Sequence, residues 1–179
     1  MPEQQSGQQA RLIRGGELVV DDSRAFQPPE GDGQALPPDE PGWVVPLDTW
    51  LGAQDALRAR SHPVAVQISP DDDVARLAGE SGAVDPRGIA FIAVSFPVYT
   101  DGRGYSQAQL LRQRYGWQGE LRAVGDVMID TIHYQARCGF DSFLVKPGHD
   151  PHRALAAFGT FTQHYQQAYP KPVPPQRAA

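Results

Sequence analysis

The chain has a single cysteine, Cys138, among its 179 residues. One cysteine cannot form a disulfide within the chain, and it cannot supply the several thiolates of a cysteine-only zinc or iron–sulfur site. Dithiol redox chemistry would need a second thiol from elsewhere. These absences favour a reducing, cytoplasmic compartment. Cys138 itself is expected to be a small buried side chain, and a nucleophile is the alternative, although no histidine is spaced to serve as its base.

Long apolar runs and basic runs are also missing. No stretch approaches the length that spans a bilayer, and residues 1–6 lack both the charge and the apolar core of a signal peptide. The formal net charge is −5 and the pI is near 5.4, and no basic patch is present that would neutralise phosphates. We therefore expect a cytoplasmic protein that binds neither membranes nor nucleic acid.

The motifs of common cofactors and active sites are absent as well. The chain has no G-x-G-x-x-G after its first strand, no G-x-x-x-x-G-K-[ST], no nucleophile elbow and no H-E-x-x-H. His149 and His152 flank a predicted helix start and would hold a metal only with ligands from elsewhere. The sequence therefore identifies no cofactor and predicts no metal site.

The two ends of the chain differ in composition from its centre. Residues 1–10 are rich in glutamine and residues 170–179 are rich in proline, so we expect both ends to be disordered. Residues 11–169 have the length of one α/β domain. Within this domain an apolar run at 17–20 precedes the segment 27–42, whose Pro, Gly and acidic residues predict a loop.

Short apolar runs and helix-start signals alternate in the second part of the chain. The runs predict strands at 64–68, 89–95, 121–124 and 142–145. Capping residues predict helices that start at Asp48 (ending near Ser61), Ser69, Ser106, Asp126 and Asp150 (carrying Tyr165). The acidic run 71–73 fits helix capping at Ser69, and a metal site is its alternative.

This βαβαβαβα series predicts an α/β fold with a mainly parallel sheet joined by crossover helices. The chain is too short for eight full units, so an open sheet and a half TIM-type barrel both remain as architectures. In either case ligands collect at the carboxyl ends of the parallel strands. We therefore expect a site in the loops 96–105, 125–127 and 146–150.

The loop 96–105 is the most informative of these segments. It leads from a strand into a helix start and carries Arg103 between two glycines. Free backbone N–H groups at a helix start, together with the fork of an arginine, suit an anion. The candidate ligand-binding residues are therefore Gly102, Arg103, Gly104, Tyr105 and Ser106. Alternatively, Asp101-Gly102 forms a turn and Arg103 pairs with a nearby carboxylate.

Two further loops contribute Asp126 and Lys146. Asp101 and Asp126 are the candidate acid/base residues, although Asp126 is also placed to cap a helix. Lys146 is a candidate contact for an anion such as phosphate or sulfite, or a solvated lysine at the end of a strand. Arg122 lies in an alternating strand and is either a buried ion-pair member or a ligand-binding residue.

Two other groups of side chains leave alternatives open. Tyr99 and Tyr105 flank the glycine loop, where they either stack on a planar ligand or pack the loop down. His133 lies on an apolar helix face, which favours a core histidine over a ligand-binding one.

Three motifs stand in order along the chain: 100–106 (TDGRGYS), 119–127 (GELRAVGDV) and 137–141 (RCGFD). Together they resemble a bacterial family of unknown function called DUF934, over residues from about 13 to 165. Members of that family are often encoded beside sulfite reductase and are labelled as probable oxidoreductases of sulfite reduction. The resemblance therefore implies a role in assimilatory sulfite or sulfate reduction.

The residues give the oxidoreductase label little support, because flavin, nicotinamide, haem and cluster motifs are missing. We expect an accessory protein that binds a small anionic ligand or docks on sulfite reductase. One alternative is a (βα)-type enzyme or oxidoreductase acting on an anionic substrate. Another is an assembly role with the Gly-Arg-Gly loop as an interaction turn. A homodimer is plausible because half-barrel units often pair.

Overall fold

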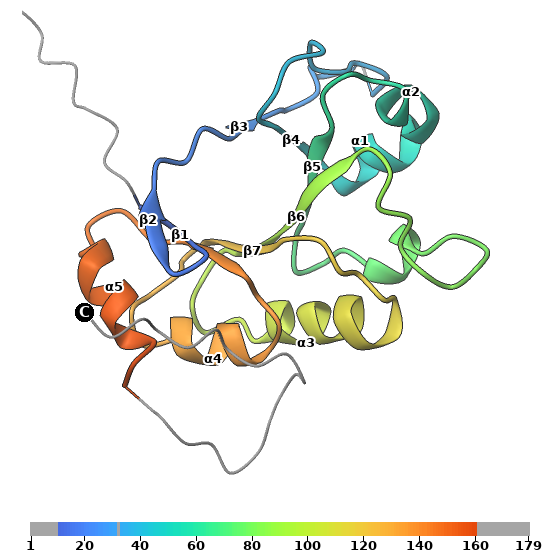
Figure 1. Ribbon diagram of the computed structural model, residues 1–179. Helices are drawn as coiled ribbons and strands as arrows, with labels where there is room; N and C mark the ends of the chain where they lie inside the picture. Colours follow the sequence, from blue (N-terminus) through green and yellow to red (C-terminus); the bar gives the residue numbers. More distant parts are fainter. Residues whose placement is uncertain (1–10, 32, 161–179) are drawn as a thin grey trace, which may run out of the picture.

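The computed structural model of the protein describes residues 11–31 and 33–160 (Figure 1). Its strands form one eight-stranded sheet. They are β1 (Leu12–Arg14), β2 (Glu17–Val19), β3 (Arg24–Ala25), β4 (Trp43–Pro46), β5 (Val64–Ile68), β6 (Ile89–Phe96), β7 (Leu121–Gly125) and β8 (Ser142–Leu144). The order across the sheet is β2-β1-β8-β7-β6-β5-β4-β3.

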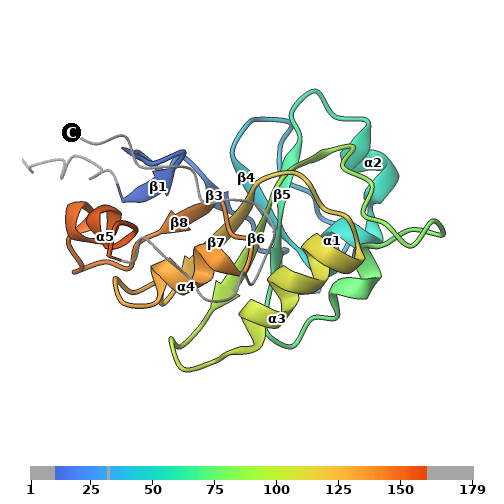
Figure 2. The ribbon, with the colours of Figure 1, turned by 60° about the horizontal axis from the view of Figure 1, so that its bottom comes forward.

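The sheet is mostly parallel and curls into a half-barrel (Figures 1 and 2). Strands β3 to β8 pair in parallel, whereas β1 pairs antiparallel with both β2 and β8. The predicted α/β class is confirmed, and of the two architectures the half-barrel is the one observed. The carboxyl ends of β5 to β8 consequently meet along one edge of the half-barrel, the edge where ligands collect in such folds.

The helices connect the strands and lie on the outside of the curl (Figure 2). They are α1 (Leu47–Gly52), α2 (Gln54–Arg58), the 3-10 turn η1 (Val74–Leu77), α3 (Arg103–Gln109), the π-helical turn η2 (Leu110–Arg114), α4 (Ile132–Arg137) and α5 (Pro151–Ala157). None of the helices in the described ranges is both long and apolar enough to cross a membrane.

The core lies between the sheet and these helices. Val66, Ile92 and Leu121 from the central strands are fully buried, as are Leu111 and Ile132 from the helices. The four strands predicted from apolar runs are all present as β5, β6, β7 and β8. These strands are flanked by other strands and covered by helices, which is why their sequences are almost continuously apolar.

The first half of the sheet was not predicted. Only the apolar run at 17–20 was noted there, whereas the structure holds β1, β2, β3 and β4. These strands are two to four residues long. So short a strand carries no detectable period, and β1 is a strand because it pairs with β8 from the other end of the described chain.

A short strap closes the open side of the half-barrel. Strands β2 and β3 follow one another in the chain but lie at opposite edges of the sheet, and only residues 20–23 join them. Such a link spans at most roughly 17 Å, at about 3.4 Å per residue. The two edges must therefore lie close together, as they do in a curled sheet. Residues 27–42 hold no helix or strand at the positions that are described.

Two predicted helix starts were wrong. The helix predicted from Asp48 is broken at Ala53, and its N-cap is Pro46 rather than Asp48, which lies in the first turn. No α-helix starts at Ser69, because Asp72 Oδ2 accepts hydrogen bonds from Ser69 N (2.6 Å) and Oγ (2.9 Å). The serine is thus held in a turn, and only the 3-10 turn η1 follows.

Two other starts were displaced. Helix α3 begins at Arg103, three residues before Ser106, because Asp101 Oδ1 accepts the N–H of Arg103 (3.1 Å). Helix α4 begins at Ile132. It does not start at Asp126, whose carboxylate is occupied by other partners, described below. The helix start at Asp150 is confirmed, since its carboxylate accepts the N–H of His152 at 2.9 Å. Tyr165 lies outside the described residues.

Candidate functional site

The loops after β5, β6, β7 and β8 meet at the carboxyl edge of the sheet. Most of the predicted charged site residues lie there, in two ion-pair clusters that share the loop 97–102. We call them the Arg103 cluster (Asp71, Asp101, Arg103) and the Lys146 cluster (Asp126, Lys146).

The Arg103 cluster is held by two carboxylates. Arg103 Nη2 lies 2.7 Å from Asp101 Oδ2, and Nη1 lies 2.5 Å from Asp71 Oδ1. Hydrogen bonds from Arg103 lower the pKa of Asp101 below its usual range, and the same bonds raise the pKa of the guanidinium. This is the arrangement in which Arg103 pairs with a nearby carboxylate. Arg103 and Asp71 are 55% and 86% exposed, so a competing charged group can reach the pair from solvent.

The Lys146 cluster is more enclosed. Lys146 Nζ lies 2.5 Å from Asp126 Oδ1, and Asp126 Oδ2 accepts the backbone N–H of Tyr99 at 2.8 Å. Asp126 N in turn donates to Phe96 O at 2.7 Å. The hydrogen bond from Lys146 and then that from Tyr99 N lower the pKa of Asp126. Asp126 therefore stays ionised at neutral pH and ties the ends of β6, β7 and β8 together.

Of the two glycines that flank Arg103, only Gly104 has a packing role. A Cβ on Gly104 would lie 2.7 Å from the ring of Phe96, so residue 104 is glycine because a buried ring lies against it. Gly102 has no atom within 4 Å of such a Cβ. Gly125 has φ +94°, and a Cβ there would lie 2.5 Å from Phe96 O. The close pairing of β6 and β7 at Phe96 and Gly125 thus requires glycine, and Gly125 positions Asp126.

Tyr105 and Ser106 do not join the charged clusters. The Tyr105 ring packs 5.2 Å from the rings of both Phe96 and Tyr134, and burial raises its pKa. These ring contacts are those expected of a side chain that packs the loop down. Ser106 is exposed inside α3, whereas Tyr99 remains half-exposed on the loop.

Arg122 lies away from the carboxyl edge. Its neighbours in β7, Leu121 and Ala123, face the helices, so the pleat directs Arg122 to the inner side of the curl. Its Nε and Nη2 donate to Glu120 Oε1 at 2.9 and 2.8 Å, and Nη1 donates to Asp21 Oδ1 at 3.1 Å. Arg122 is thus a buried ion-pair member, one of the two roles expected from the sequence, and its pair with Asp21 anchors the strap.

Arg112 was missed by the sequence analysis. The π-helical turn η2 aims its side chain inward, where it is completely buried. Its Nε donates to Gly139 O (2.9 Å), Nη1 donates to Trp117 O and Gly119 O (2.8 Å each), and Nη2 pairs with Asp141. Two of the three motifs that resemble DUF934 therefore meet at one structural arginine. No motif of known chemistry contains it.

Cys138 and His133 lie on or beside α4. Cys138 is completely buried, and burial raises the pKa of its thiol, which favours the predicted structural role. Its Sγ accepts a long contact of 3.8 Å from Gln109 Nε2. His133 is half-buried. Within residues 11–31 and 33–160, no three His, Cys, Asp or Glu side chains are grouped so that they could hold a metal ion.

The comparisons with known proteins identify a family and no function. Neither the curated proteins nor the solved structures contain a match to this chain. The family described as "Bacterial protein of unknown function (DUF934)" matches residues 65–175. That range is more than half of the chain. It includes all three motifs and every residue of the two ion-pair clusters. The chain belongs to the DUF934 family.

Proposed function

We propose that the protein is an accessory protein of assimilatory sulfite or sulfate reduction that acts by binding the reductase. The assignment to this pathway rests on the DUF934 resemblance, which implies a role in sulfite or sulfate reduction. The binding role is supported by one observation at the carboxyl edge. The two predicted anion-binding cations that lie at this edge, Arg103 and Lys146, are already matched by carboxylates of the same edge. The edge is thus a fixed, charged surface with no unmatched cation in these two clusters.

A fixed charged surface suits a protein partner better than sulfite or sulfate. A small anion would have to displace Asp101 and Asp71 from Arg103, or Asp126 from Lys146, and it brings few contacts of its own to offset that loss. A protein partner can add contacts over a wide area while the clusters stay intact. Electrostatic complementarity of this kind sets specificity and association rate.

Catalysis by the two candidate carboxylates has less support. A general base works best when its pKa lies near the operating pH. Arg103 and Lys146 lower the pKa values of Asp101 and Asp126, which makes both carboxylates weaker bases than usual. An enzyme using either residue would first need substrate to break its ion pair.

The first test compares small ligands with the reductase. We expect purified assimilatory sulfite reductase from the same bacterium to bind the full chain in interferometry. We expect the melting temperature of the protein itself to stay unchanged with sulfite, sulfate, adenylyl sulfate, flavins and nicotinamide nucleotides. A ligand at a hundredfold excess over its Kd would add about 2.7 kcal/mol, so a real small-molecule site would be visible.

The matched variants are Arg103→Ala and Arg153→Ala. Both arginines are exposed, but Arg153 lies on α5, outside the two clusters. We expect Arg103→Ala to weaken reductase binding and leave the melting temperature nearly unchanged, whereas Arg153→Ala changes neither. Saturable stabilisation by sulfite that disappears in Arg103→Ala would replace the proposal by the small-anion role. A large fall in melting temperature in Arg103→Ala would show a structural pair.

A further inference from the structure

The loop between the two clusters exposes two apolar side chains at the carboxyl edge. Val98 and Tyr99 are each 52% exposed, directly after the buried end of β6. We call this pair the tip. Tyrosine is one of the residues that most often anchor protein interfaces, because it buries a large area and loses little side-chain entropy. The tip does not enter the core of the protein, so its apolar side chains have no packing role there.

The tip is held rigidly although it is exposed. The backbone N–H of Tyr99 donates to the carboxylate of Asp126, and Asp101 N donates to Val98 O at 3.0 Å. On one side Lys146 fixes Asp126, and on the other Arg103 fixes Asp101. A preformed tip binds with a smaller entropic cost than a loop that must become ordered. The two clusters therefore act as supports that present Tyr99 to a partner.

The charge around the tip indicates what that partner is like. The loops after β5 to β8 and the first residue of α3 carry two cations, Arg103 and Lys146. They carry seven carboxylates: Asp71, Asp72, Asp73, Asp101, Asp126, Asp130 and Asp150. The net charge of these loops is thus −5 with neutral histidines, which equals the formal net charge of the whole chain. The formal charges of the rest of the chain sum to zero, so the acidic excess of the sequence lies in the loops that surround the tip.

We propose that the tip and the acidic loops around it form a docking surface for a basic protein surface with an apolar recess that receives Tyr99. This inference rests on the proposed function in taking the reductase as the first partner to test. Charge complementarity favours a basic partner, because opposite potentials steer the encounter and like charges oppose it. A nucleic acid, an anionic membrane or the same edge of a second copy would each meet repulsion.

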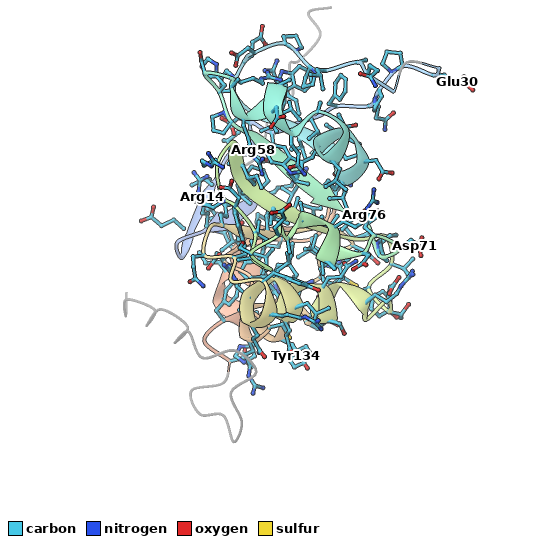
Figure 3. The ribbon with its side chains drawn as sticks, turned by 90° about the vertical axis from the view of Figure 1, so that its right-hand side faces the viewer. Arg14, Glu30, Arg58, Asp71, Arg76 and Tyr134 are labelled. Carbon is cyan, nitrogen blue, oxygen red and sulfur yellow. The ribbon has the colours of Figure 1, made fainter. Side chains whose placement is uncertain are left out.

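The experiment places a photo-crosslinker at the tip in cells of the source bacterium. Tyr99→p-benzoylphenylalanine tests the tip, and Tyr134→p-benzoylphenylalanine is the matched control. Tyr134 is 49% exposed but lies on α4, in the helical layer, well away from Asp71 of the acidic edge (Figure 3). We expect position 99 to capture peptides of a partner that contain apolar residues flanked by Lys or Arg, and position 134 to capture none of them.

Binding measurements with purified reductase supply the second readout. We expect Tyr99→Ala to weaken binding at least about thirtyfold, as for an interface anchor, without a change in melting temperature. Asp71→Asn should slow association about two- to threefold and reduce its dependence on salt, whereas Asp55→Asn on α2, which is exposed but distant in the fold, should not.

The outcomes separate this inference from the proposed function. Capture of a basic surface of the reductase supports both. Capture of a basic surface on a different protein supports the docking surface and overturns the reductase as partner. Reductase binding that survives Tyr99→Ala unchanged keeps the proposed function and overturns the tip. Crosslinks to a second copy of this chain, to an acidic surface, or none beyond those of position 134 overturn the docking surface.

Discussion

Replacing Arg112 by methionine tests whether the buried arginine holds the second half of the fold together. Methionine fills a similar volume but donates no hydrogen bonds. The carbonyls of Gly139, Trp117 and Gly119 would lose their donors, and Asp141 would lose its cation. A buried acceptor left without a donor costs about 1–3 kcal/mol, and breaking a buried ion pair costs about 3–5 kcal/mol.

Asp141 is 38% exposed, so water can replace part of what it loses. Three carbonyls at the low end of the range, with a small contribution from Asp141, give a loss of about 3–5 kcal/mol in the free energy of unfolding for Arg112→Met. For a chain of this size that corresponds to a fall in melting temperature of roughly 6–20 °C. Urea unfolding followed by tryptophan fluorescence measures the loss, with Trp117 as a nearby reporter.

The matched control is Arg114→Met. Arg114 lies two residues further along the same helical turn but is exposed, with its guanidinium 5.7 Å from the ring of Tyr115. We expect its loss to stay within about 0.5 kcal/mol. Arg112→Lys should rescue only part of the loss, because an ammonium cannot reach acceptors in all the directions of a guanidinium. A loss below about 1 kcal/mol in Arg112→Met would refute the structural role assigned to it.

Three further predictions concern other parts of the chain. Gly104→Ala should lower the free energy of unfolding by about 1–3 kcal/mol, since its methyl would lie 2.7 Å from a buried phenyl ring, whereas Gly102→Ala, in open space, should be nearly neutral in the same urea titration. The pKa of Asp39 falls from 3.8 to about 2, mainly through the backbone N–H of Ser61, so its stabilisation is complete above about pH 4 and is lost as the pH falls through about 2. Asp39→Asn should flatten that part of a pH titration of the melting temperature, and an unchanged acid limb would contradict this. Native Cys138 should react with iodoacetamide far more slowly than in urea, and equal rates by mass spectrometry would show that it is accessible.

The central strands could be predicted because the sequence alone marks what is buried on both faces. Val64–Ile68 and Ile89–Phe96 are almost continuously apolar, with one polar residue each. Helix starts were less predictable, because an aspartate has several uses. Asp150 caps its helix as expected, whereas Asp72 turns back to Ser69 and Asp126 binds partners from two other loops.

The candidate site was predictable in place but not in its internal pairing. Parallel topology alone brings Arg103 and Lys146 to one edge, and that followed from the order of strands. Their partners did not follow, since Asp71 reaches Arg103 from the loop after a different strand. The exposure of Val98 is likewise a property of the folded loop. Arg122 and Asp21 pair across the sheet, and no local pattern in the sequence reports such a contact.

The strap at 20–23 has a consequence for the order in which the protein folds. It joins strands at opposite edges, and β1 must find β8 from the far end of the described chain. Contacts between such distant residues form slowly, because the loop-closure entropy is lost before they stabilise the chain. We expect β5 to β7 to assemble first. The amino-terminal hairpin of β1 and β2 should dock against β8 last. In pulse-labelled hydrogen exchange the amides of β1 should then gain protection later than those of β6, and simultaneous protection would contradict this order.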